Sequence, residues 1–149
     1  MDNFQIQLVW QLFLALLLGG IIGIDRERKK RAAGLQTCSL VALGSCLFTI
    51  ISCELFNYFL NKPGVSFDPS RIVLAVATGI GFIGAGVIIY RQDHVEGLTT
   101  AAALWTTASI GVAVGIKFYF LALVATFFTV LVLFVLGFLE QKIFPKTHR

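Results

Sequence analysis

Apolar runs of about 20 residues recur along this 149-residue chain, and they restrict its possible folds more than any other feature. A helix of about 20 residues crosses roughly 30 Å of hydrocarbon, where only structures that satisfy their own backbone hydrogen bonds are stable. Charged residues make up 13% of the chain, against roughly 25% in a typical soluble domain. The sequence therefore predicts an all-α membrane protein with a single domain over residues 1–149.

The apolar runs predict five transmembrane helices. Asp68 and Pro69 favour a helix start, because the carboxylate can accept a backbone N–H and proline loses no helical bond in the first turn. The first run has no basic segment before it and no small-residue cleavage site near its end, so we expect it in the mature protein. The predicted helices cover residues 4–24, 37 to 55–60, 69–90, 98–116 and 118–139.

The basic residues indicate how these helices cross the membrane. Nine of the 12 Lys and Arg residues fall on one side of the five predicted crossings, and Lys62, Arg71 and Lys117 fall on the other. Loops rich in Lys and Arg stay in the cytoplasm. We therefore predict an amino terminus outside and a carboxyl terminus in the cytoplasm. The same clustering explains the net charge of +4 better than nucleic-acid binding does.

Glycines are concentrated in the third predicted helix, and a second stripe of small residues follows in the fourth. Small residues let two helix backbones approach closely in a bilayer. We therefore expect these two helices to form the packing centre, and a Gly81→Leu substitution to destabilise it. The fifth helix is bulky and is expected on the outside of the bundle or at a dimer face. The packing residues would be Gly79, Gly81, Gly84, Gly86, Ala103, Thr107 and Gly111.

The sequence Gly-Leu-x-Thr occurs twice, at residues 34–37 and 97–100, each time at a predicted helix start on the basic side. This indicates a parallel repeat, in which helices one and two correspond to helices three and four. Two adjacent helix starts concentrate positive partial charge, which suits an anion or the carboxylates Asp25 and Asp93. We expect a functional site with Asp25 held by amides or by Arg26; the alternative is two separate helix caps. The site residues would be Asp25, Arg26, Gly34, Thr37, Gly97, Thr99 and Thr100.

Arg71 is a further candidate functional residue, because ionisable groups near helix ends often mark function in membrane proteins. It starts the third helix on the outer side, where Glu54 is expected too, so the two side chains could pair as a clamp or as part of an ion entry. Catalytic constellations are missing, and the two histidines and three cysteines lack the spacing of a metal site. The sequence predicts no enzyme and no cofactor, and it leaves metal binding open.

Three segments resemble the transmembrane domain of the MgtC/SapB family of bacterial inner-membrane proteins. They read GIDRERKKRAAGLQT at residues 23–37, RIVLAVATGIGFIGAGVII at 71–89 and GLTTAAALWTTASIG at 97–111. In the family the first segment resembles G-x-E-R followed by A-G-L-R-T, so Asp25 replaces Glu and Gln36 replaces Arg. Many members continue into a soluble carboxyl-terminal domain, which this sequence is expected to lack. The resemblance covers nearly the whole chain.

The resemblance implies a multi-pass protein of the bacterial inner membrane, linked to growth at low magnesium and to survival inside macrophages. It also implies modulation of other membrane proteins, including ATP synthase and a magnesium pump. We therefore favour a non-enzymatic regulator that binds integral membrane proteins through its small-residue faces and forms a homo-oligomer, such as a dimer. The alternative is a small oligomeric channel or transporter for magnesium or another cation, with Asp25, Glu54, Arg71 and the threonines of the fourth helix lining one cavity.

Overall fold

The computed structural model describes residues 3–60, 62, 68–91 and 94–143, and these residues form five helical segments. Four of the segments are long and apolar enough to cross a membrane, while α3 is apolar but has 17 residues, about 26 Å at 1.5 Å per residue. The all-α membrane fold is confirmed. The helices are α1 (Asn3–Arg28), α2 (Leu35–Phe59), α3 (Ser70–Gly86), α4 (Leu98–Gly115) and α5 (Tyr119–Leu131), which continues through η1 (Val132–Leu136) and α6 (Gly137–Ile143).

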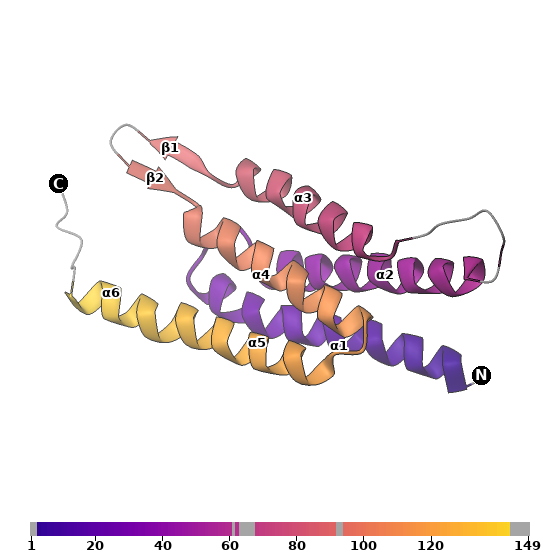
Figure 1. The fold of residues 1–149 in the computed structure, drawn as a ribbon. Helices are drawn as coiled ribbons and strands as arrows, with labels where there is room; N and C mark the ends of the chain where they lie inside the picture. Colours follow the sequence, from indigo (N-terminus) through magenta and orange to yellow (C-terminus); the bar gives the residue numbers. More distant parts are fainter. Residues whose placement is uncertain (1–2, 61, 63–67, 92–93, 144–149) are drawn as a thin grey trace.

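Successive helices run in alternate directions, so the helix ends gather at two opposite ends of the bundle (Figure 1). One end holds the end of α1, the starts of α2 and α4, and α6, and we call it the basic end because most of the described Lys and Arg residues lie there. The opposite end holds the start of α3 and the turn between α4 and α5. This alternation is the one that five crossings require.

The third helix ends earlier than predicted, at Gly86, and is followed by a small antiparallel hairpin at the basic end (Figure 1). Its strands are β1 (Ile89–Arg91) and β2 (His94–Glu96), with Tyr90 opposite Val95. Gly86 interrupts the helix, and the β-branched and aromatic residues after it favour an extended chain. Gly97 closes the hairpin with a φ of 92°, and a side chain there would overlap the carbonyl oxygen of Val87.

The packing centre is α2 against α1 and α4, which corrects the prediction that α3 and α4 form it. A Cβ on Gly19 of α1 would lie 2.6 Å from the Cys38 carbonyl oxygen and 2.7 Å from the Ala42 Cβ. A Cβ on Gly111 of α4 would overlap the carbonyl oxygen of Ala42 itself. Ala42 therefore touches glycines of both neighbouring helices. The predicted small stripe of α4, including Ala103 and Thr107, is buried as expected, but its Gly111 and Gly115 pack against α2 and not against α3.

The glycines of α3 mostly face away from the other helices. No described atom of another helix lies within 4 Å of the position that a Cβ would take on Gly79, Gly81 or Gly86. Gly84 is the exception, since its Cβ would lie 3.4 Å from the Cβ of Ala101 on α4. Within this chain, only Gly84 among these four supports the close approach that the sequence analysis expected. α3 is attached chiefly to α4 and lies at the edge of the bundle (Figure 1).

Candidate functional site

The last two turns of α1 contact the starts of both α2 and α4 at the basic end. A Cβ on Gly23 would lie 2.6 Å from the Cα of Leu35, so α1 and the first turn of α2 are in close backbone contact. The backbone N–H of Leu35 donates to the Glu27 carboxylate at 3.1 Å, which satisfies one free amide of the α2 start. α1 therefore continues to Arg28, beyond the predicted end at residue 24, because its charged residues find partners along the helix.

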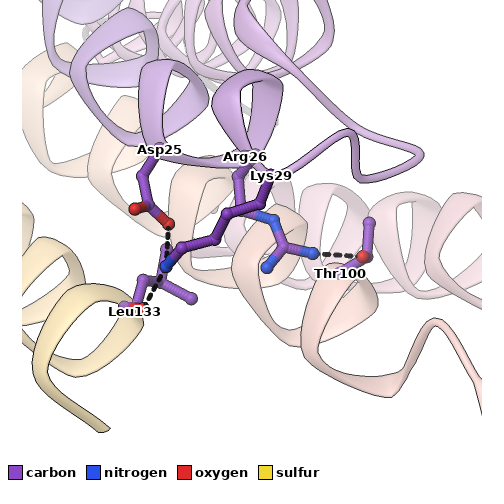
Figure 2. A network of polar contacts seen from close by, with 5 residues as sticks. All are labelled: Asp25, Arg26, Lys29, Thr100 and Leu133. Atoms are coloured by element: carbon purple, nitrogen blue, oxygen red, sulfur yellow. Dashed lines mark hydrogen bonds and ion pairs between the residues drawn. The ribbon is translucent and has the colours of Figure 1, made fainter. Parts of the chain in front are cut away.

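Arg26 is the buried charge of this site. Its side chain is 3% exposed and reaches α4, where its Nη2 donates to the hydroxyl of Thr100 (Figure 2). Its Nε is buried without an acceptor, and none of the ion pairs in the described part of the chain includes it. A buried charge is normally paired, because taking it out of water costs several kcal/mol. A buried guanidinium without an anionic partner is therefore unusual.

Lys29 links α1 to the last helix (Figure 2). Its ammonium lies 2.9 Å from the Asp25 carboxylate and donates to the Leu133 carbonyl oxygen at 2.8 Å. Leu133 belongs to η1, a short π-helical segment, and such segments often occur at functional sites. A Cβ on Gly137 would lie 3.4 Å from the ammonium, so glycine keeps room for it. One lysine thus ties the ends of two helices together.

The structure brings together part of the predicted site. Arg26 and Thr100 are in contact, and Gly34 packs against the Glu27 side chain, which a Cβ on Gly34 would overlap. Asp25 is held by Lys29, and not by Arg26 or by amides as expected. The predicted alternative carboxylate, Asp93, lies outside the described residues.

The other predicted residues are spread more widely. Thr37 is half-buried on the first turn of α2, and Thr99 is exposed on the first turn of α4. Arg71 is exposed at the opposite end of the bundle, at the start of α3. No ion pair joins it to Glu54 in the part of the chain that the structure describes. The expected clamp between these two residues is therefore absent there.

The predicted repeat is visible in the helix starts. α2 begins at Leu35 and α4 begins at Leu98, the equivalent positions of the two Gly-Leu-x-Thr copies. The preceding glycines differ, since Gly34 has a φ of −101° and Gly97 a φ of 92°. The linkers differ too, because a short loop precedes α2 and a β-hairpin precedes α4. The correspondence is thus limited to the helix starts.

Gln11 is a structural residue that the sequence analysis passed over. It is fully buried on α1, and its Nε2 donates to the carbonyl oxygens of Val114 at 2.9 Å and Gly115 at 3.0 Å, at the end of α4. It also lines a cavity of about 190 Å³ at the opposite end of the bundle, with Glu54 and Lys117. A single amide inside an apolar run was the signal that could have identified it.

Glu27, Lys29 and Leu133 were also missed. Asp25 and Lys29 are four residues apart, a spacing that places them on one face of a helix, so this pair could have been predicted from the sequence. No sequence pattern pointed to Leu133, because Lys29 binds its backbone carbonyl oxygen in a π-helical segment. The described residues contain no cluster of three or more His, Cys, Asp or Glu side chains that could hold a metal ion.

Comparison with known proteins identifies the family. The profile of the MgtC family matches residues 12–142. The chain belongs to the MgtC family. It is 41% identical to YhiD of Escherichia coli K12, which is named as a candidate magnesium transporter. The 142 aligned residues cover 95% of this chain and 66% of YhiD. It is 38% identical over 136 residues to protein SapB of Bacillus subtilis, which is 91% of this chain and 59% of SapB.

A further MgtC-family relative is protein MgtC of Brucella abortus, which is 40% identical over 118 residues, covering 79% of this chain and 46% of that protein. The chain spans about half to two-thirds of the length of these curated relatives. No solved structure matches it. Family membership and the apolar helices together establish a membrane protein, in agreement with the sequence analysis.

Proposed function

We propose that this MgtC-family chain is a non-enzymatic protein of the bacterial inner membrane that regulates other integral membrane proteins during adaptation to low magnesium. The observation that carries the proposal is an open face of α3 with Gly79 and Gly86, which are seven residues apart and have no described atom of another helix within 4 Å of the position that a Cβ would take. Within hydrocarbon there is little hydrophobic drive between helices, so association depends on close packing at small residues. An unused small face on an edge helix suits a partner helix.

The position of α3 strengthens this proposal. Only Ile80 and Gly84 of α3 are buried, so one side of the helix holds it to α4 and the remaining surface is available. Ala75 and Gly79 are exposed and four residues apart, which places them on one face of the helix. A helix from another membrane protein, or α3 of a second copy, could approach closely at this face. The partner is therefore expected to present small residues as well.

The alternative is a cation transporter, which the name of the E. coli relative favours for that protein. In this chain the charged residues expected to line one cavity lie at two ends of the bundle, Asp25 at one and Glu54 and Arg71 at the other. The buried Arg26 sits beside the start of α4, so the basic end repels cations at that point. A magnesium path through a single copy is therefore the weaker candidate.

The experiment that tests the proposal compares one double and one single substitution in cells. Gly79→Leu with Gly86→Leu fills the open face of α3, and we expect it to abolish crosslinks to other membrane proteins from a photoreactive residue at position 75 and to impair growth at low magnesium. Gly44→Leu is the matched control, because Gly44 on α2 also has no described atom within 4 Å of its Cβ position.

Two results would contradict the regulatory proposal. The first is normal growth at low magnesium by the double variant at parental protein levels. The second is magnesium flux by the purified protein in liposomes that contain no other protein, which would establish the transporter instead.

A further inference from the structure

An apolar groove lies between α4 and the last helix, near the basic end. Its volume is about 260 Å³. Two of its threonines turn their hydroxyls toward their own helices, since Thr106 donates to the Ala102 carbonyl at 2.9 Å and Thr129 to the Ala125 carbonyl at 2.7 Å. The groove is therefore lined mainly by carbon. Its residues are Thr99, Ala102, Ala103, Thr106, Phe128, Thr129, Val132 and Leu133.

One end of this groove is the first turn of α4. Thr99, the second residue of α4, lines the groove, and the next residue, Thr100, receives the hydrogen bond of Arg26. Gly97 precedes the helix and supplies no side-chain cap, so the first amides of an 18-residue helix lack a side-chain acceptor. A helix start of this kind attracts an anion.

Among the described charged residues at this end, Arg26 is the one that is buried and has no ion pair, whereas Arg28, Lys30 and Arg31 are exposed. Asp25 and Lys29 neutralise each other at 2.9 Å, and Lys29 also bonds to Leu133, which lines the groove (Figure 2). Glu27 is turned toward the start of α2, where it accepts the N–H of Leu35. Arg26 remains, 97% buried and directed at Thr100, with its Nε unpaired.

We propose that the groove binds an anionic phospholipid, with one acyl chain between α4 and the last helix and the phosphate beside Arg26 and the first amides of α4. The apolar groove suits an acyl chain, and the positively charged start of α4 suits a phosphate. From Thr99 to Thr106 the groove follows α4 for about 10 Å at 1.5 Å per residue, a length that a free phosphate would leave unfilled. Basic pockets between transmembrane helices on the cytoplasmic side are suited to anionic headgroups. This proposal does not depend on the regulatory role.

The test is native mass spectrometry of the purified full chain with phosphatidylglycerol and phosphatidylcholine that carry the same acyl chains. We expect about fivefold more retained phosphatidylglycerol, the gain that one basic residue gives at a membrane surface. Arg26→Gln should remove this headgroup preference, while Arg28→Gln, an exposed arginine on the same helix, should keep it. Thr106→Trp should fill the groove and lower retention of both lipids, while Ser109→Trp, which lies outside the groove lining, should not.

Three results would overturn the proposal. The first is equal retention of the two lipids by the parental chain. The second is displacement of phosphatidylglycerol by millimolar inorganic phosphate, which would assign the charged end to a free anion. The third is undiminished phosphatidylglycerol binding by a folded Thr106→Trp variant, which would place the lipid elsewhere or leave the groove to a second copy. Because the third result uses only the Thr106→Trp variant, it tests the proposal even if Arg26→Gln does not fold.

Discussion

The glycines of α1 and α4 and the glycines of α3 have opposite surroundings. A Cβ on Gly19 would lie 2.6 Å from the Cys38 carbonyl oxygen, and one on Gly111 would overlap the Ala42 carbonyl oxygen. Gly79 and Gly81 have no described atom within 4 Å of the same position. Glycine in a membrane helix thus permits close packing, but the residue alone does not say which helix, or which molecule, uses it.

The difference follows from where α2 lies. α2 presents Cys38, Ala42 and Thr49 to its neighbours, and each of them lies close to a glycine of α1 or α4. α3 contacts α2 far less than it contacts α4, and among its glycines only Gly84 lies close to α4. The tightly packed region is therefore a three-helix core, and α3 is an addition at its edge. Substitutions should divide the glycines into the same two groups.

The largest effect is expected for Gly111→Leu. The new side chain would collide with backbone atoms of α2 that cannot move without separating the core helices. Overpacking of this kind costs about 1–3 kcal/mol or more. Gly81→Leu, which the sequence analysis expected to be destabilising, should change the free energy of unfolding by less than about 0.5 kcal/mol. Thermal unfolding of both variants in detergent measures the contrast, and equal melting temperatures would show that the two regions do not differ.

The next largest effect is expected for Gln11→Leu, which tests the polar contact of the core. The substitution removes both hydrogen bonds to the carbonyl oxygens of Val114 and Gly115. Each bond is worth about 0.5–1.5 kcal/mol, so we expect a loss of about 1–3 kcal/mol. Gln5→Leu is the control, because Gln5 is exposed on the same helix. If both variants unfold alike, the buried amide does not hold α1 to α4.

Gly84 should show intermediate behaviour, because it is the one glycine of α3 with a near neighbour. Its Cβ would lie 3.4 Å from the Ala101 Cβ, which is ordinary contact, so Gly84→Ala should be tolerated. Gly84→Leu should push α3 away from α4 and cost about 1 kcal/mol, the low end for overpacking. A disulfide crosslink between α3 and α4 offers a second readout. Unchanged crosslinking in Gly84→Leu would place Gly84 with the open glycines.

The smallest effect concerns the start of α3. The Asp68 carboxylate accepts hydrogen bonds from the Ser70 hydroxyl at 2.6 Å and the Ser70 N–H at 2.9 Å, and these bonds hold the pKa of Asp68 below its ordinary value. A lowered pKa means that this contribution is present above the ordinary Asp pKa and is lost as the pH falls through the lowered pKa. We expect the Ser70 amide resonance to shift over that acidic range. Asp68→Asn should abolish the shift, and a shift that persists would assign it to another group.

Most of the fold was predictable because its signals are local. Apolar length and basic ends predicted five helices, and Gly-Leu-x-Thr predicted the starts of α2 and α4 within two residues. Asp68 was expected to cap the third helix, and it accepts the N–H of the first residue of α3. The end of α3 was wrong, because its apolar run continues into the residues of β1. An apolar run alone does not distinguish a helix from a strand.

Helix partners and long-range contacts were less predictable. The contact between Arg26 and Thr100 was expected because the pattern of helices places both residues at the same depth in the bilayer, at the basic end. The pairing of α4 with α2 was missed, because small stripes on α1, α3 and α4 are equally compatible with several neighbours. The Lys29 bond to Leu133 depends on a π-helical segment, for which the sequence offers no pattern.

The Gln11 contact has a consequence for how the protein is made. Its partner carbonyl on Val114 is 103 residues later in the chain. At about 5–20 residues per second, α4 follows α1 out of the ribosome by roughly 5–20 s. During that interval the amide of Gln11 has no native partner, and an unpaired amide is costly in hydrocarbon. We therefore expect α1 to remain beside the insertion machinery until α4 arrives.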